Sequence, residues 1–274
     1  MKIKRFLSIV LLVCISLFAT EKQKLVFGVN PNKSTTEIQI LYAELISYLE
    51  KELEQEVVLV ISKDYNHLIT LIEQGSIDIA SISPKLYAIL RQKEPETHYL
   101  ATIQFADEQS ISKSTYRSLI LTLADSPIAS MSDLKGKSFG FTDPDSTSGY
   151  LYPHFMMYQN SIDPTKDLGK IYMLKKHPKI IQALFEKSIE AGAIYDGVYH
   201  ALPKEEQQKI RILAVSEEIP YDAMIASKRL DSALVVKIRE LLLAFHPKQA
   251  LPSTIAGFEE KPLFLYDHLN TIEY

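Results

Sequence analysis

The sequence predicts an α/β protein with two lobes, and three observations support this fold class. Short β-rich runs alternate with amphipathic helical segments, a pattern typical of parallel sheets with right-handed helical crossovers. The order strand, helix, strand, helix, strand, helix occurs twice, and the second copy follows the first at a constant offset of 112 residues, as between Phe27 and Phe139. The 274 residues, of which 46% are hydrophobic, can bury one large core or two modest ones.

The internal repeat is one of pattern more than of identity. Two strands, a cluster of hydroxyl residues and one aromatic position align at this offset without a gap. The aligned pairs are Phe27–Val29 with Phe139–Phe141, Ser34–Thr36 with Ser146–Ser148, Val57–Ile61 with a strand near 171–174, and Tyr65 with His177. Ligands of open α/β sheets bind beyond the carboxyl ends of the strands. The polar residues that follow the strands are therefore expected to face a cleft between the lobes.

Two segments are predicted to connect the lobes. Residues 116–122 form a strand that enters the second lobe, and residues 210–222 bring the chain back. A helix from Ser232 to Phe245 is then expected to pack on the first lobe. The resulting division places residues 21–116 and 222–274 in lobe 1 and residues 117–221 in lobe 2. Two crossovers make a hinge, which is the usual device for closing lobes on a ligand.

The N-terminus has the features of a secretory signal peptide at residues 1–20. A basic start, Met1–Arg5, precedes an apolar run from Phe6 to Ala19, which is shorter than the roughly 20 residues of a membrane-spanning helix. We therefore expect an exported protein without stable membrane insertion of the mature chain, although an uncleaved anchor is an alternative. The chain carries a net charge of −4, which argues against a nucleic-acid partner.

The turn Asp143–Gly149 is the strongest candidate for a binding site. A short apolar strand, 138–142, precedes it, and a helical run from Tyr150 to Tyr158 follows. Ser146, Thr147 and Ser148 thus stand at a helix N-terminus, where backbone N–H groups lack partners and the helix dipole favours negative charge. Hydroxyls and free N–H groups together suit a tetrahedral oxyanion. The alternative is plain helix capping, which needs only one such residue.

The sequence offers little support for an enzyme, a cofactor or a metal. Gly136–Gly140 matches the G-x-S-x-G pattern of serine hydrolases, but a helical turn precedes the serine and a strand follows it, which inverts the required order. No phosphate-binding loop or dinucleotide motif occurs, and the seven histidines show no metal-ligand spacing. His177 is interpreted as a hydrogen-bond donor rather than a general base, because no nucleophile or metal accompanies it.

One stretch, Thr142-Asp-Pro-Asp-Ser-Thr-Ser-Gly-Tyr-Leu-Tyr-Pro153, resembles the signature of the periplasmic phosphate/phosphite/phosphonate-binding proteins of ABC transporters. The resemblance covers nearly the whole mature chain and continues through further segments: Asp64-Tyr65, Tyr116–Ser118, Asp133–Lys137, His177 and Ile219–Asp222. It implies a two-lobed type II periplasmic binding protein fold, a periplasmic location, no catalytic activity and an ABC permease as partner.

The resemblance also implies the roles of individual residues. The phosphonyl oxygens would be held by six side chains: Tyr65, Tyr116, Ser146, Thr147, Ser148 and His177. Asp222 matches a carboxylate of the family's cleft, which is tolerable beside an anion only if the ligand offers a donor such as P–OH or an amine. Three residues that follow predicted strands are further candidates: Thr35, Ser83 and Asp196.

One departure from the family concerns the organic part of the ligand. Members that select aminoalkyl phosphonates carry a second carboxylate where this chain has Val198, although Asp196 lies close by. We therefore expect a small ligand with a P–OH or P–H group rather than a long aminoalkyl chain. The main functional reading is capture of a phosphonate, phosphite or phosphate for an ABC importer. The alternative is a module that reports an oxyanion to a separate sensor kinase.

Overall fold

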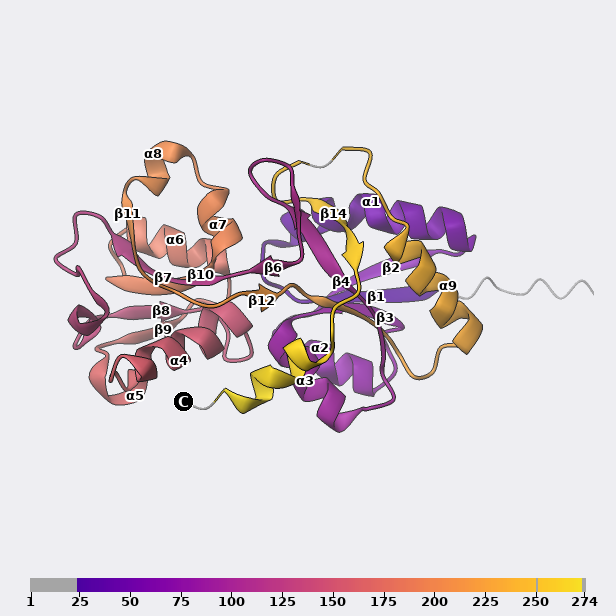
Figure 1. The fold of residues 1–274 in the computed structure, drawn as a ribbon, viewed down its shortest axis with the longest axis horizontal. Coiled ribbons are helices and arrows are strands. Elements are labelled where there is room, and N and C mark those ends of the chain that lie inside the picture. Colours follow the sequence, from indigo (N-terminus) through magenta and orange to yellow (C-terminus); the bar gives the residue numbers. More distant parts are fainter. Residues whose placement is uncertain (1–23, 250, 273–274) are drawn as a thin grey trace, which may run out of the picture.

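The computed structural model describes residues 24–249 and 251–272, so the predicted signal peptide lies outside the described part. Figure 1 shows two groups of helices and strands side by side, each built around its own sheet. This arrangement confirms the predicted α/β class. No helix within the described residues is long and apolar enough to cross a membrane.

The first sheet is built on the alternation that the sequence predicts. Its six leading elements are β1 (Leu25–Val29), α1 (Thr35–Leu53), β2 (Val57–Ile61), α2 (Tyr65–Glu73), β3 (Ile79–Ile82) and α3 (Pro84–Lys93). β1 lies between β2 and β3 and is parallel to both. The helices cover both sides of the sheet, with α1 over one hydrophobic core and α2 and α3 over the other.

The second sheet repeats this order. Its corresponding elements are β8 (Phe139–Phe141), α4 (Tyr152–Gln159), α5 (Pro164–Asp167), β9 (Ile171–Met173), α6 (His177–Phe185), β10 (Ala191–Tyr195), α7 (Asp196–His200) and α8 (Lys204–Gln207). β8 lies between β9 and β10 and is parallel to both, as β1 is in the first sheet. The predicted repeat is therefore a repeat of topology.

Two glycines show how closely the copies agree. A Cβ on Gly28 would lie 2.8 Å from Leu68 and 2.9 Å from Ile77, and a Cβ on Gly140 would lie 2.7 Å from Ile189 and 3.0 Å from Ile180. The contacted side chains occupy equivalent positions in the two copies, 112 residues apart. Each central strand therefore needs a glycine, because a side chain of the following helix and one from the segment after that helix pack against its backbone.

Antiparallel strands complete both sheets. β4 (His98–Ala106), β5 (Ser112–Lys113), β13 (Ala223–Ala226) and β14 (Ile255–Glu259) extend the first sheet, and β7 (Ser118–Leu123) and β11 (Ile210–Val215) extend the second. β13 pairs with β3, and β7 pairs with β10. In both sheets, the strand that follows a crossover segment (β13 or β7) pairs with the last of the three parallel strands (β3 or β10).

The crossovers themselves form a small ladder between the sheets. β6 (Thr115–Tyr116) pairs antiparallel with β12 (Ile219–Pro220), with Tyr116 opposite Ile219. Both strands lie between the two groups of elements in Figure 1. The predicted hinge therefore consists of two strands that are hydrogen-bonded to each other.

The C-terminal part of the chain returns to the first sheet. α9 (Ser232–Leu243) packs on β4 and β14, as the sequence predicts for residues 232–245. α10 (Phe264–Asp267) and a 3₁₀ turn at His268–Thr271 pack on α3. Leu269 and Ile272 of this end share a hydrophobic cluster with Tyr116 and Ile219 of the crossover strands. The C-terminal turn therefore packs against the hinge.

Candidate functional site

A cavity of about 580 Å³ lies between the two sheets, and residues of both sheets line it. Nine of the ten candidate residues line this cavity: Tyr65, Ser83, Tyr116, Ser146, Thr147, Ser148, His177, Asp196 and Asp222. The tenth, Thr35, lies elsewhere. The residues that the sequence places after separate strands are therefore brought together at one place.

The segment Ser146–Ser148, here called the hydroxyl turn, stands at the start of the first helix in the second copy. Ser146 is the N-cap, and its Oγ accepts a hydrogen bond from the Gly149 N–H at 3.1 Å. One π-helical turn, Thr147–Leu151, follows before α4 begins. A Cβ on Gly149 would lie 1.9 Å from Thr142 Oγ1, so the turn requires glycine there. Capping thus uses the Ser146 hydroxyl, whereas Thr147 and Ser148 are buried beside it at the cavity wall.

Two tyrosines from different parts of the fold interact with the hydroxyls of this turn. Tyr65 is the first residue of α2, and Tyr116 lies in crossover strand β6. Burial raises the pKa of both phenols, and neighbouring hydroxyls of the turn partly offset the shift, Ser146 for Tyr65 and Ser148 for Tyr116. Both phenols therefore keep their protons at neutral pH and can donate hydrogen bonds to an anion held at the turn.

His177 occupies in α6 the position that Tyr65 occupies in α2, the first residue of the helix. Burial lowers the pKa of its imidazole to about 3, and the charge of Lys33 adds to this shift. Nδ1 accepts a hydrogen bond from the Tyr195 N–H at 3.3 Å. The ring is therefore neutral with its proton on Nε2, which favours the donor role over that of a general base.

Asp222 follows crossover strand β12, and its carboxyl group is buried. Burial raises the pKa of Asp222 to about 6, while hydrogen bonds from Asn30 and Ser81 oppose this shift. Asn30 Nδ2 lies 3.4 Å from Asp222 Oδ2, and Tyr42 donates to Ser81 Oγ at 2.9 Å. With a pKa near 6, this group gains or loses a proton easily in the physiological range, which suits a ligand that itself carries one exchangeable proton.

Ser83 and Asp196 are two further polar groups of the cavity. Ser83 precedes α3, and its buried Oγ has no hydrogen-bond partner among the described residues, so it is available to a ligand. Asp196 begins α7, and burial raises the pKa of its carboxyl group. Val198, two residues further, packs in the hydrophobic core of the second sheet and does not line the cavity.

The hydroxyl cluster of the first copy, Ser34–Thr36, does not line the cavity, unlike Ser146–Ser148 in the second copy. Thr35 is exposed in the first turn of α1 and does not line the cavity. Ser34 and Glu37 form a capping box, in which Glu37 Oε2 accepts from the Ser34 N–H at 2.9 Å. This exchange satisfies the helix end locally, and it turns these hydroxyls away from ligand binding.

Several lining residues were not found from the sequence. Lys33 lies in the loop between β1 and α1, and its charge lowers the pKa of Tyr195 from the value that burial alone would give. Tyr195 ends β10 and packs edge-on against both Tyr116 and His177. The repeat could have pointed to Tyr195, because it corresponds at the 112-residue offset to the candidate Ser83. No pattern singles out Lys33, because a lysine in a loop is usually solvated.

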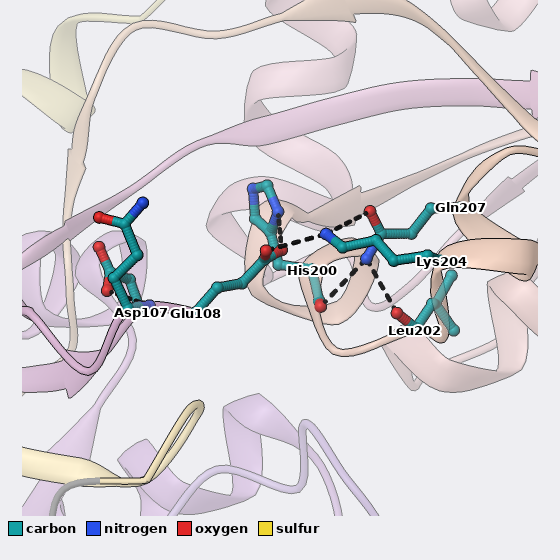
Figure 2. Close-up of polar contacts among 7 residues, drawn as sticks. Asp107, Glu108, His200, Leu202, Lys204 and Gln207 are labelled. Atoms are coloured by element: carbon teal, nitrogen blue, oxygen red, sulfur yellow. Dashed lines mark hydrogen bonds and ion pairs between the residues drawn. The ribbon is translucent and has the colours of Figure 1, made fainter.

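Contacts between the two sides surround the site. At its floor, the Lys85 N–H at the start of α3 donates to Thr147 Oγ1 at 2.9 Å. At its mouth, Glu108 in the loop after β4 reaches the second sheet's helices, where it contacts His200 Nδ1 and Lys204 Nζ, each at 2.9 Å. Figure 2 shows Glu108 extending between these two side chains. Polar contacts therefore join the two sides of the molecule at both places.

The described residues contain no group of three or more His, Cys, Asp or Glu side chains placed to hold a metal ion. The donors around the hydroxyl turn are instead phenols, hydroxyls, an imidazole N–H and backbone N–H groups. Such a set can surround an anion with several acceptor oxygens.

Comparisons with known proteins agree with this geometry. The sequence profile of a family described as the periplasmic substrate-binding protein of phosphonate ABC transporters matches residues 27–260. The phosphate-import protein PhnD of Mycolicibacterium smegmatis is 31% identical over 124 residues, which are 45% of this chain and 38% of that protein. The chain thus spans well under two thirds of this relative.

A second relative and a solved structure match over more of the chain. The phosphonates-binding periplasmic protein of Escherichia coli is 25% identical over 235 residues, 83% of this chain and 68% of that protein. The structure of PhnD1 from Prochlorococcus marinus in complex with methylphosphonate superposes with a TM-score of 0.76 at 16% identity and covers 91% of this chain and 96% of that one. This chain belongs to the family of periplasmic substrate-binding proteins of phosphonate ABC transporters.

Proposed function

We propose that the protein captures a phosphonate, phosphite or phosphate-type oxyanion outside the cytoplasm and delivers it, chemically unchanged, to the permease of an ABC importer. The family match supports the transport role, since the family consists of periplasmic binding components of such importers. The signal-peptide pattern of residues 1–20 supports export of this chain.

The observation that carries the proposal is the convergence of neutral donors on the Ser146–Ser148 turn. Tyr65 comes from the first sheet, Tyr116 from the hinge and His177 from the second sheet, and all three keep a proton at neutral pH. A hydrogen bond to a charged group contributes about 1.5–3 kcal/mol. Donors from both lobes can therefore hold an anion firmly only when the lobes are closed around it.

Asp222 adds a preference for a protonated ligand. Its ionised carboxylate would repel a fully ionised anion in a desolvated cavity, but it would accept a hydrogen bond from a P–OH group. Phosphorus oxyanions can offer such a proton near neutral pH, because the second pKa of a phosphate ester is about 6 and a protonated fraction remains available there. Sulfate is fully ionised in the same range and offers no donor.

The reporting role, in which the protein would signal an oxyanion to a separate sensor kinase, has no comparable support. The family match concerns a transport component, and it extends across most of the chain. We therefore place transport first.

A titration of the exported chain tests the proposal. Calorimetry with phosphite, phosphate, methylphosphonate and sulfate should detect binding of at least one phosphorus oxyanion and much weaker binding of sulfate. Recovery of the bound compound and its identification by ³¹P resonance should return it unchanged. Failure of all three phosphorus compounds to bind, or tighter binding of sulfate, would refute the proposed ligand class.

A further inference from the structure

The cavity is much larger than a small oxyanion needs. Its volume of about 580 Å³ falls within the range of roughly 300–1,000 Å³ that is typical of pockets for drug-sized ligands. The Ser146–Ser148 turn and its donors occupy one part of the lining only. The remaining part must face either water or a substituent attached to the phosphorus.

A chain of aromatic rings leads from the turn into this remaining space. Tyr116, which borders the turn, stacks on Tyr221 with ring centroids 4.8 Å apart and an interplanar angle of 25°. Tyr221 in turn contacts Phe105, at the end of β4, with centroids 4.7 Å apart. All three rings line the cavity, and Leu41 of α1 lines it as well. The cavity lining is mixed, and its apolar surface beyond the anion donors is concentrated at Leu41, Phe105 and Tyr221.

The charged groups near the mouth of the cavity are mostly paired with one another. Glu108 contacts His200 and Lys204, and Arg117 contacts Glu218 at 3.2 Å. Lys113 lies 3.8 Å from Asp107. Because these charges already have partners within the protein, the mouth offers little to a strongly charged substituent. Asp196 and Lys33 also line the cavity and are not part of these pairs, and burial together with the charge of Asp196 raises the pKa of the neighbouring Tyr221 phenol.

We propose that the ligand is an organophosphorus oxyanion whose apolar or aromatic substituent packs on Phe105 and Tyr221 while the phosphonyl oxygens bind at the hydroxyl turn. This inference rests on the proposed function and specifies the part of the ligand that the anion site leaves undefined. Apolar surface that leaves water on this wall stabilises the complex, and flat rings gain further from offset or edge-on contacts with the aromatic side chains. The wall makes no distinction between a C–P and a C–O–P linkage.

A series of ligands with one anionic group and increasing substituents tests this inference on the unaltered protein. Calorimetry with methyl-, propyl- and benzylphosphonate should show that affinity rises by about threefold to fourfold for each methylene that is buried. Aminoethylphosphonate has nearly the shape of propylphosphonate with an ammonium in place of the last methyl group, and it should bind more weakly than the propyl compound. Phenylphosphonate and phenyl phosphate distinguish the two linkages, and both should bind.

Substitutions locate the effect. Phe105→Ala should remove most of the gain from the propyl and benzyl groups, and it should weaken propyl- and benzylphosphonate binding by a larger factor than methylphosphonate binding. Phe264→Ala, at a ring that is 66% exposed on α10, is the matched control and should change neither. A flat or falling series in the unaltered protein, with methylphosphonate still bound, would overturn this inference alone. Absence of binding by every phosphorus compound would instead overturn the proposed function, and this inference with it.

Discussion

The Tyr195 N–H donates a hydrogen bond to Nδ1 of His177 over 3.3 Å, and this contact assigns the imidazole its role. A neutral imidazole has one N–H, so the proton must reside on Nε2. Burial keeps the pKa of His177 near 3, far below neutral pH. The ring is therefore uncharged at the N-terminus of α6, with an N–H at Nε2 that can donate, and it corresponds to Tyr65 at the N-terminus of α2.

Replacement of His177 should weaken anion binding to the same extent at pH 6 and pH 8. We expect His177→Ala to lower affinity by about tenfold to a hundredfold, because one hydrogen bond to a charged group is lost. His177→Gln, which keeps an N–H near the Nε2 position, should recover part of this loss. Calorimetric titrations at both pH values check the prediction. A loss that is much larger at pH 6 would indicate a protonated, cationic histidine and contradict the assignment.

Asp222 should make the ligand-free protein less stable as the pH rises. The pKa of an unfolded Asp is about 3.9, whereas the pKa of Asp222 in the fold is about 6. The folded state therefore binds the proton more tightly, and its free energy of unfolding falls as the pH rises through the window from about 4 to 6. Asp222→Asn should remove this penalty and raise the free energy of unfolding by about 2 kcal/mol at pH 7, but by little at pH 4.

Urea unfolding of the ligand-free protein at pH 4 and pH 7 measures this difference. Asp125→Asn is the control, because its side chain is 69% exposed and pairs with Lys187 at the surface. An Asp222→Asn variant that is equally destabilised at both pH values would show that the carboxyl group has ordinary solvation and a structural role only.

Glu108 should prolong the closed state without deciding which ligand binds. Its contacts with His200 and Lys204 join the loop after β4 to α7 and α8, but the side chains are 40–67% exposed. Exposed ion pairs contribute about 0.2–1 kcal/mol and weaken with salt. Glu108→Gln should therefore speed ligand dissociation by about twofold to fivefold at low salt, and the difference should shrink at high salt.

Stopped-flow displacement of the bound ligand provides the rates for this test. Glu205→Gln changes an exposed carboxylate of α8 close to the same contacts and serves as the matched control. If Glu108→Gln and Glu205→Gln dissociate ligand at the same rate, the contact in Figure 2 does not hold the lobes together.

Binding should also bring the lobes closer, because donors from both sheets and the hinge must converge on one anion. The two crossover strands, β6 and β12, provide a short paired hinge for this motion. Small-angle scattering should give a smaller radius of gyration at saturating ligand than without it. Superimposable curves would argue for a rigid site that does not depend on closure.

The fold could be predicted from the sequence because several independent features of the sequence indicate the same two-copy arrangement. The alternation of strands and helices, the offset of 112 residues and the crossover segments all recur in the structure. Gly28 and Gly140 illustrate why the signal is strong, since each must admit side chains of the following helix and of the segment after it at close range. The π-helical turn at Thr147–Leu151 had no such signal, because it depends on how Gly149 packs against Thr142.

The candidate site was only partly predictable, and Thr35 shows the reason. A hydroxyl at a helix N-terminus can cap the helix or face a ligand, and local sequence does not decide between the two. In the first copy, Glu37 completes a capping box with Ser34, whereas the second copy has Gly149 at the corresponding position of its turn. Lys33 and Phe105 line the cavity through tertiary packing alone, and neither the repeat nor a motif indicates them.

The central claim is that the Ser146–Ser148 turn binds the anion, and calorimetry on one variant tests it most directly. Triple replacement of Ser146, Thr147 and Ser148 by alanine should weaken binding of the best phosphorus oxyanion by about a thousandfold or more, since three hydroxyl contacts are removed. Replacement of Ser130, which caps the 3₁₀ turn Met131–Leu134, and of Ser132 within that turn should leave affinity unchanged, because neither residue lines the cavity. Thermal unfolding should confirm that the triple variant is folded. Affinity of that folded variant equal to the unaltered protein's would contradict the claim.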